Sequence, residues 1–596
     1  MKKLFAWLDE RTGLGAALAS AVDEDVRGGA RWAFSPGSTL VALLVVECFT
    51  GMLLALTFAP SVGSAWASVW FIEHRVTMGW FLRGMHANAS QATVVVLGLH
   101  LLQVVVYGAY KKPREVNWWL GLVLLLLVQA LVLTGTRLAW DQRTYWALMV
   151  ELNIADSVPV VGPAVADLVR GGSEIGQQTL TRLYGLHVAV LPALTVAVVV
   201  AHRMLVRRHG LTPPSGADLG RTDKLWPAQI ARNVAVAVVV IGLVAAATTM
   251  AHGAPLDAPA DPARDYPARP EWYLLFLYAA RDLLPGDLEV LATVVAPSLA
   301  GLGLFLLPLL DRKASHRVRE RFVFVVPVVL GVVGMGALTA YSMSADARDP
   351  EHQVALGKAR EHAARSVAIA GHGVPPAGPL EMLRADPMTQ GRVVFEQQCM
   401  PCHVLDEEGE REAPEHTGWG SRAWVRGFLA NPDSMRHYGP IKQEAERHGR
   451  ETSLDDMPLM ARKIPNDVDA VAEFLFAEGR EPHDPPVDAA LVARGLRVFR
   501  SKCTDCHVYR GEGNDLGNPA PDLTGWASRT WIRRQMTAPD AETQFGEANE
   551  MPSFAEDISE HDLDMVAGFL RQQRFRTPPT GEPPARARGA APPEHP

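Results

Sequence analysis

The sequence predicts an all-α protein in two parts: a bundle of seven transmembrane helices, followed by two similar water-soluble domains. Three observations support this prediction. Residues 1–345 contain long apolar runs, whereas residues 346–596 are charged, rich in proline and without an apolar stretch of membrane length. Seven windows in the first part are apolar enough to cross a bilayer. The second part contains the same short motif twice, within a longer internal repeat.

The predicted spans follow from apolar windows of about 20 residues. An odd number of spans places the two ends of the bundle on opposite sides of the membrane. Lysine and arginine gather in connections such as Lys111-Lys112 and Arg203–Arg208, which marks that face as cytoplasmic. We therefore expect a bacterial inner-membrane protein, inserted without a cleavable signal, with a cytoplasmic N-terminus and the second part outside. The spans lie near residues 38–60, 80–108, 116–137, 183–206, 229–250, 288–310 and 321–343.

Length and charge limit the remaining possibilities. A chain of 596 residues is too long for one core. A net charge of −8, without a basic block beyond short loops, gives no reason to expect a nucleic-acid partner. The expected domains are a four-span domain (1–215), a three-span domain (216–345), a linker (346–388), two soluble domains (389–482 and 483–576) and a disordered tail (577–596).

Two of the predicted spans each carry two histidines. His86 and His100 are 14 residues apart in the second span, and His187 and His202 are 15 apart in the fourth. On a helix, such intervals separate two side chains by about 21–23 Å and leave them near one face. Both helices run from outside to inside, so His86 faces His187 near the outer surface and His100 faces His202 near the inner one. Each pair can sandwich a haem iron between two imidazoles.

A single histidine in a membrane helix often only hydrogen-bonds to a neighbouring helix. Two matched spacings favour haem ligation instead, because buried ionisable groups are costly in a bilayer. We therefore predict two non-covalent haems b. Arg83, Arg114 and Arg182, at the ends of these helices, are candidates for pairing with haem propionates, or alternatively membrane-edge residues that reach the headgroups.

Two Cys-x-x-Cys-His motifs stand in the second part. This spacing lets two thiols reach two haem vinyl groups while the following histidine coordinates the iron, so we predict two covalent haems c. Zinc sites and disulfides are the competing interpretations. The histidine after each cysteine pair and the location outside the membrane disfavour both. The motif residues are Cys399, Cys402 and His403 in the first copy, and Cys503, Cys506 and His507 in the second.

The segments after the two motifs also match each other, including Thr-Gly-Trp at 417–419 and at 524–526. A Met-Pro pair follows in each repeat, at Met457 and at Met551. This order resembles small class I cytochromes c, and the resemblance implies that Met551 and Met457 are sixth ligands. For the first repeat the neighbouring Met460, His437 and His448 stay open as alternatives, since a methionine is often only a gap filler.

The membrane part resembles cytochrome b. The resemblance lies in Gly79–Arg83 before His86, in Lys111–Glu115, in Trp140–Gln142 and in Gly176–Arg182 before His187. It is most similar to the short, plastid-type form, which has the same 15-residue histidine interval and ends after four spans. A separate subunit supplies three further spans in that form, and here both parts are fused.

Pro270, Glu271, Trp272 and Tyr273 match the family's quinol-site signature. The resemblance implies quinol oxidation at the outer face, with Glu271 as proton acceptor or, alternatively, as a structural hydrogen-bond partner. One electron goes to a Rieske iron–sulfur protein, which must be a separate chain because haem takes four of the five cysteines. The other crosses the two haems b to reduce quinone near the inner face, against the membrane potential.

The same resemblance implies a homodimeric complex in a lipid membrane that couples electron transfer to proton translocation. The dihaem part then passes electrons to a soluble or membrane cytochrome c or to a terminal oxidase. A non-bifurcating haem anchor for a dehydrogenase or reductase is the alternative, and the quinol-site loop disfavours it. A haem-based sensor is a further alternative, which methionine sixth ligands disfavour because a sensor needs an open iron position.

Two departures from the family pattern concern the cofactors and the quinol pocket. Relatives with an extra inner haem attach it through a cysteine just before the first span, where this chain has Ser35, so a third membrane haem is not expected. Cys48 lies within the span instead and is predicted to be a small buried apolar residue. The family's Gly-Tyr-x-Leu-Pro-Trp after the third span is replaced by Gly-Thr-Arg-Leu-Ala-Trp at 135–140. The outer quinone pocket is therefore expected to be recognisable but altered.

Overall fold

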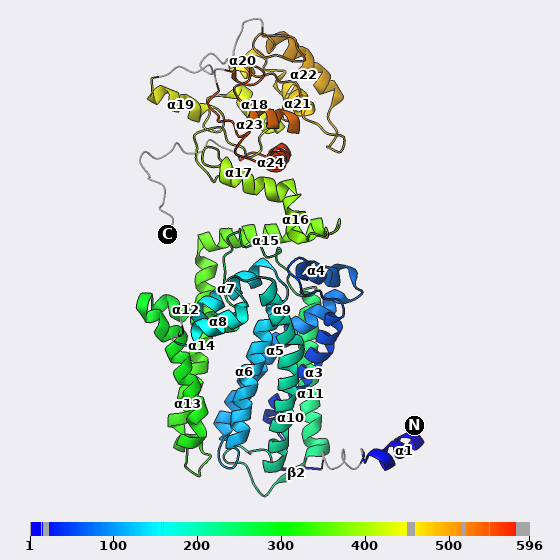
Figure 1. The fold of residues 1–596 in the computed structure, drawn as a ribbon, viewed down its shortest axis with the longest axis vertical. Coiled ribbons are helices and arrows are strands. Elements are labelled where there is room, and N and C mark those ends of the chain that lie inside the picture. Colours follow the sequence, from blue (N-terminus) through cyan, green and yellow to red (C-terminus); the bar gives the residue numbers. More distant parts are fainter. Residues whose placement is uncertain are drawn as a thin grey trace. The chain divides into compact units, whose positions relative to one another are not determined.

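The computed structural model of this chain is built almost entirely of helices (Figure 1). The strands among the described residues are β1 (Asp25–Arg27) and β2 (Thr222–Lys224), which form one short antiparallel ladder. The chain divides into two compact units, Met1–Leu380 and Glu381–Pro596. The prediction of an all-α protein with a membrane part and a soluble part is thus confirmed. The structure describes residues 2–13, 15, 23–156, 158, 160–449, 459–514, 520–546 and 549–579.

Seven helices of the described chain are long and apolar enough to cross a membrane, which confirms the predicted number. Three of them contain a π-helical turn. The label η below marks such π-helical turns (η2, η3, η6 and η8) and also short 3-10 helices (η1, η4, η5 and η7). These helices carry many exposed valine and leucine side chains, as expected of surfaces that face lipid. They are α3 (Pro36–Ala55), α5 (Gly79–Tyr107), α6 (Glu115–Arg137), α9–η2–α10 (Gln177–Gly185, Leu186–Val190, Leu191–His209), η3–α11 (Leu225–Gln229, Ile230–Met250), η6–α13 (Leu291–Val295, Ala296–Leu310) and α14 (Phe322–Arg348).

Within the bundle, α3 packs against α5 and α11, and α6 packs against α10. Gly84 permits the close approach of α5 to the end of α11, because a Cβ there would lie 2.5 Å from Thr248 Cγ2. At the other end of α5, the carboxylate of Asp311 accepts hydrogen bonds from Tyr110, Lys111 and Arg321 at 2.6–2.8 Å. These contacts join the first four spans to the last three in one compact unit.

Short helices cover the ends of the spans. The predicted linker contains a regular helix, α15 (Pro350–Ala370), whose start is capped by the side chain of Asp349. This helix packs against α4, where Trp70 Nε1 donates to the carbonyl of Val367 at 3.1 Å. The other short elements of this unit are α1 (Lys2–Thr12), η1 (Trp32–Phe34), α4 (Ala65–Arg75), α7 (Gln142–Asp156), α8 (Gly162–Arg170), η4 (Trp272–Leu274), α12 (Leu275–Leu283), η5 (Gly286–Leu288) and η7 (Val318–Glu320).

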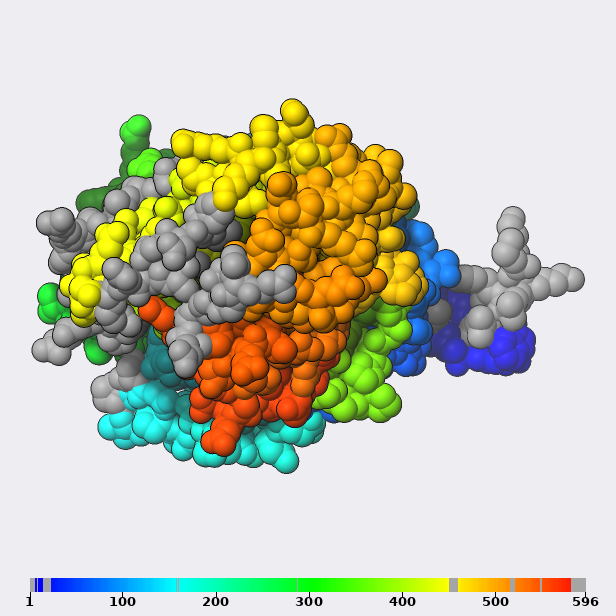
Figure 2. Space-filling model, turned by 90° about the horizontal axis from the view of Figure 1, so that it is seen from above, coloured from blue at the N-terminus to red at the C-terminus, as the bar shows by residue number. Residues whose placement is uncertain are grey.

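The soluble unit contains both repeats in one body, drawn yellow to orange-red in Figure 2. A single hydrophobic core includes buried residues from each repeat, among them Trp419, Trp424, Trp526 and Trp531. Its helices are α16 (Pro379–Arg384), η8 (Pro387–Gly391), α17 (Arg392–Gln398), α18 (Arg422–Ala430), α19 (Gly439–Arg447), α20 (Met460–Lys463), α21 (Val468–Glu478), α22 (Ala489–Lys502), α23 (Arg529–Thr537) and α24 (Glu560–Gln573).

The two repeats exchange their terminal helices. The first helix of the first repeat, η8–α17, packs against α24 of the second, while α22 of the second repeat packs against α21 of the first. A glycine stands at each crossing. A Cβ on Gly391 would lie 2.2 Å from the Met565 carbonyl oxygen, and one on Gly495 would lie 2.0 Å from that of Ala470. The predicted domains at 389–482 and 483–576 therefore correspond to repeats of the sequence that share one core.

Candidate functional site

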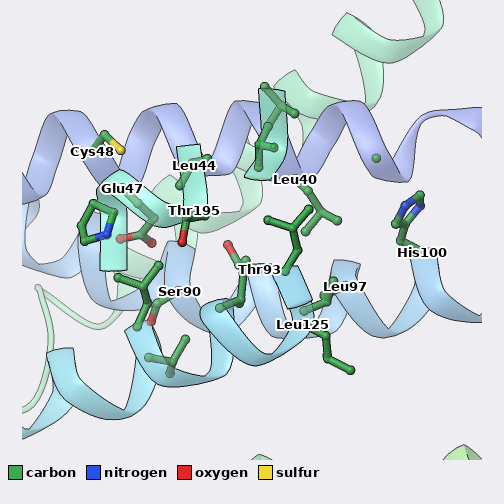
Figure 3. A pocket seen from close by; sticks show the side chains of 18 of the residues that line it. Leu40, Leu44, Glu47, Cys48, Ser90, Thr93, Leu97, His100, Leu125 and Thr195 are labelled. Carbon is green, nitrogen blue, oxygen red and sulfur yellow. The ribbon is translucent and has the colours of Figure 1, made fainter. Parts of the chain in front are cut away.

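One large cavity of about 1300 Å³ lies inside the membrane unit, between α3, α5, α6 and α10. Its walls are mostly apolar, with a few polar side chains such as Glu47, Ser90, Thr93 and Thr195 pointing inward (Figure 3). All four histidines singled out in the sequence line this cavity.

The outer two histidines face each other with the geometry of shared ligands. The ring centres of His86 and His187 are 6.1 Å apart, and their planes are nearly perpendicular at 85°. Two imidazoles that bind one metal through bonds of about 2 Å place their ring centres about 6 Å apart. The spacing observed here thus fits an iron between the two rings.

A π-helical turn explains how unequal histidine intervals stay in register. Residues Leu186–Val190, which include His187, form the π-helical turn η2 within the fourth span. Such a turn holds about one residue more than an α-helical turn. It therefore absorbs the extra residue between His187 and His202, relative to the 14-residue interval in α5.

The four imidazoles are oriented in the same way. In each ring Nδ1 contacts an oxygen atom, which leaves Nε2 as the nitrogen available to a metal. Three of the contacts cross to another helix, and the fourth, from His100, stays within α5. The contacts are His86 with Thr50 Oγ1 (2.9 Å), His100 with Gln103 Oε1 (3.2 Å), His187 with the Leu131 carbonyl (3.0 Å) and His202 with the Asn117 carbonyl (3.1 Å).

A glycine stands opposite each histidine, and the sequence analysis missed these residues. Each pair of glycines is 14 residues apart on its helix, a spacing that matches His86 and His100 and could have revealed them. Without side chains, they leave room for a large flat group beside the rings. A Cβ would lie 3.2 Å from His100 Cε1 at Gly37, 3.0 Å from His86 Cε1 at Gly51, 3.5 Å from His202 Cε1 at Gly121 and 2.4 Å from His187 Cε1 at Gly135. The residues of the cavity thus fit two haems.

Two of the three arginines proposed to pair with haem propionates line the cavity, and the third does not. Arg83 and Arg114 line the cavity, whereas Arg182 is exposed and donates to a backbone carbonyl of α8 at 2.6 Å. Arg143 and Arg207 also line the cavity, although the sequence analysis did not select them. Arg203 lines it as well, so five arginines are placed where they can meet carboxylate groups of a bound cofactor.

The quinol-signature loop meets the same cavity. Glu271 and Trp272 are among its lining residues, and Trp272 Nε1 donates to Gln91 Oε1 on α5 at 2.6 Å. Tyr273 is buried, and its hydroxyl has no hydrogen-bond partner in the part of the chain that the structure describes. Pro270 directly precedes Glu271 and is partly exposed. The loop thus places a carboxylate at one end of the cavity.

A buried arginine stands behind this carboxylate, at the variable position of the segment in which Thr136 and Ala139 depart from the family pattern. The side chain of Arg137 is 1% exposed and forms ion pairs with Glu151 and, at 3.5 Å, with Glu271 Oε1. Burial raises the pKa of Glu151 on α7, and the positive charge of Arg137 opposes this rise. The altered segment therefore supplies a cation that contacts the proposed proton acceptor, a contact that the sequence analysis did not anticipate.

The two Cys-x-x-Cys-His motifs have the same local structure. His403 Nδ1 contacts the carbonyl of Pro414 at 2.8 Å, and His507 Nδ1 contacts that of Pro521 at 2.9 Å. Each motif directly follows a helix, α17 or α22. The histidine rings are thus fixed by equivalent prolines, with Nε2 available to iron as in the membrane sites.

The structure describes one of the two proposed sixth ligands, Met551. Met551 packs against the shared core, and its Sδ lies 3.7 Å from the amide nitrogen of Gln535. Met457 lies outside the described residues. Of the alternatives for the first repeat, Met460 and His437 are buried, whereas His448 is exposed and contacts Glu444.

Replacing Met551 by alanine is expected to leave the haem attached, because its thioether links and His507 remain. The reduction potential of that haem should fall, since the thioether ligand favours reduced iron. Redox titration and the absorption spectrum of the purified protein test this. Met536→Leu, a change at a buried methionine of α23, is the control. An unchanged potential and spectrum would show that another residue is the sixth ligand.

Comparisons with known proteins agree with this arrangement. The family model for cytochrome b(N-terminal)/b6/petB matches residues 91–259, and that for cytochrome b(C-terminal)/b6/petD matches 259–356. The model for cytochrome C oxidase, cbb3-type, subunit III matches residues 490–570, around the second Cys-x-x-Cys-His motif.

Individual relatives cover the first part of the chain. Cytochrome b6 of Tupiella akineta is 35% identical over 214 residues, which are 36% of this chain and all of that protein. The menaquinol:cytochrome c reductase cytochrome b subunit of Geobacillus thermodenitrificans is 34% identical over 222 residues, 36% of this chain and 99% of that protein. A solved structure entitled "Hyperthermophilic respiratory Complex III" aligns with a TM-score of 0.51 at 25% identity, over 61% of this chain and 97% of that one. The chain is therefore an integral membrane protein of the cytochrome b family, with a c-type cytochrome domain at its C-terminal end.

Proposed function

We propose that this chain is the cytochrome b subunit of a quinol:cytochrome c oxidoreductase and holds two haems b and two haems c. The observation that supports the proposal best is the cavity with four histidines, each with a glycine opposite its ring. The names of the relatives, a menaquinol:cytochrome c reductase subunit and a respiratory complex III, agree with it.

The haems supply one-electron carriers, and the residues of this chain bind and orient them. In the membrane, His86 and His187 hold the outer haem b, and His100 and His202 hold the inner one. In the soluble unit, Cys-x-x-Cys-His residues 399–403 and 503–507 hold the haems c. Met551 and Met457 are the proposed sixth ligands.

Quinol oxidation is assigned to the end of the cavity at Glu271. Its carboxylate accepts a proton from quinol, and Arg137 holds the carboxylate from behind through their ion pair. Trp272, held by Gln91, forms the adjacent wall. Arginines at the cavity lining, including Arg83 and Arg114, neutralise the propionates.

Electron bifurcation follows from this assignment. The first electron would go to a separate Rieske protein, and the haems c held by residues 399–403 and 503–507 would supply carriers toward a cytochrome c or a terminal oxidase. For the second electron, the haems b held by His86 with His187 and by His100 with His202 would supply carriers across the membrane, toward quinone reduction near the cytoplasmic face and coupling to proton translocation. The basic connections support a cytoplasmic N-terminus and a dihaem unit outside a bacterial inner membrane. The family resemblance supports a homodimeric complex.

The haem content of the purified chain tests this proposal. Four irons per chain are expected, with equal amounts of haem b and haem c. Extraction with acid acetone should remove only the b haems, because the c haems are linked through thioethers. A count by pyridine haemochrome spectra and iron analysis measures both classes. A third covalent haem would contradict the interpretation of Ser35 as a site without an attached haem, and a single haem b would contradict the pairing of the four histidines. The prediction that Cys48 is buried is wrong, because the structure shows it exposed on α3, where it lines the cavity.

A further inference from the structure

The outer histidine pair differs from the inner pair in one charged contact. Glu47 on α3 places its Oε2 2.8 Å from His86 Nδ1, beside the Thr50 hydroxyl that contacts the same nitrogen. The carboxylate points into the cavity, as the close view shows (Figure 3). The family resemblance and the cavity's role in holding haem do not by themselves require a carboxylate at this place.

The charge of this carboxylate is poorly compensated. Its second oxygen, Oε1, is buried and finds no hydrogen-bond partner among the described residues. Across the same parts of the chain, no lysine or arginine forms an ion pair with Glu47. A charged group in such surroundings is weakly screened and acts strongly on its neighbours.

The other three histidines contact neutral oxygens. His187 and His202 meet backbone carbonyls, and His100 meets the side-chain amide oxygen of Gln103 at 3.2 Å. Glutamine and glutamate have nearly the same size, so Gln103 is the neutral counterpart of Glu47 at the inner pair. Among the contacts described at the four imidazole Nδ1 atoms, the carboxylate of Glu47 is therefore a feature of the outer pair alone.

A carboxylate at the second nitrogen of a metal-binding imidazole raises the basicity of the ligand. A more basic ligand and a nearby negative charge both favour oxidised over reduced iron, and hydrogen bonding around the axial ligands is one of the means by which a protein sets haem potentials. The contact with Glu47 should therefore lower the reduction potential of the outer haem, whereas the inner haem lacks this effect.

We propose that Glu47 is a positioning residue that orients His86 and lowers the reduction potential of the outer haem b. The contact then tunes the site from which the second electron moves on to the inner haem. This inference rests on the proposed haem ligation by the four histidines.

An exchange of the two side chains tests the inference in the full-length protein. Glu47→Gln removes the charge from the outer site, and Gln103→Glu introduces one at the inner site. Potentiometric titration of the two b haems, followed by their absorption near the α band and by low-temperature electron paramagnetic resonance, is the measurement. Glu47→Gln should raise the potential of the outer haem alone, and Gln103→Glu should lower that of the inner haem alone. The double variant should reduce or reverse the difference between the reduction potentials of the two b haems.

Thr50→Val separates charge from ring orientation. It removes the neutral contact to His86 Nδ1 without changing the charge, so a much smaller shift is expected than from Glu47→Gln. An equal shift in both variants would overturn the role of the charge, as would unchanged potentials in Glu47→Gln. If Glu47→Gln loses the outer haem, Gln103→Glu decides: a lowered inner potential supports the inference, and an unchanged one overturns it.

Failure of the underlying haem assignment has a different signature. A wild-type protein with fewer than two b haems would refute the proposed ligation itself. Two b haems with potentials that do not respond to either substitution would refute only the role of Glu47.

Discussion

Replacing Gly135 by valine is expected to abolish haem binding at the outer pair while the inner pair stays occupied. A Cβ at this position would lie 2.4 Å from His187 Cε1, closer than a real side chain permits, and the valine methyl groups extend further. The His187 ring must then leave its position opposite His86. One haem b per chain instead of two, measured by pyridine haemochrome spectra, is the expected result, together with loss of quinol-dependent electron transfer.

Two substitutions serve as references for this loss. Gly331→Val places the same side chain on α14, where nothing lies within 4 Å of the added Cβ, and should retain both b haems. Gly301→Val on α13 should also retain them, because nothing lies within 4 Å of its added Cβ either. Two b haems in Gly135→Val would show that the ring of His187 is not confined by α6 and would contradict the proposed site.

The sequence was sufficient to predict features that depend on local composition and on spacing along one helix. Hydropathy alone identified all seven spans, and helical periodicity identified the two histidine pairs that line the cavity. The four glycines follow the same 14-residue spacing and could have been found by the same reasoning. The π-helical turn at His187 could not, because no local residue preference distinguishes it from a regular turn.

Contacts between distant segments lay beyond such reasoning. Arg137 and Glu271 are 134 positions apart in the sequence, and their ion pair depends on how α6 and the 270–273 loop meet. The exchange of terminal helices between the two repeats could likewise not be predicted from the sequence. Both repeats have the same helix pattern, so each first helix fits either last helix, and the pattern does not determine which partner it contacts.

Glu271→Gln is expected to slow quinol-dependent reduction of the c haems severalfold or more while all four haems stay in place. Glutamine keeps the size of the side chain and an oxygen acceptor, but it cannot take up the proton of quinol. The same change removes one of the two carboxylates that face the buried Arg137, so the pH dependence of the rate should change as well. Stopped-flow reduction of the c haems by a quinol, recorded across pH in the assembled complex, measures both effects.

Glu151→Gln is the matched control for this experiment. It removes the other carboxylate of the same arginine but lies on α7, and Glu151 is not among the residues that line the cavity. If Glu271 is the proton acceptor, Glu151→Gln should affect the rate much less than Glu271→Gln. Equal loss in both variants would instead indicate that the ion pairs of Arg137 only hold the loop in place.

The haem count separates the two possible roles of Glu271. A structural role predicts that cofactor content and activity fall together in Glu271→Gln, whereas a catalytic role predicts full cofactor content with a slow reaction. Full activity with an unaltered pH profile would mean that the proton leaves by another route. The altered segment at 136–139, whose Thr136, Leu138 and Ala139 line the cavity, is the next place to test, because its Thr136 hydroxyl lies beside both the cavity and Arg137.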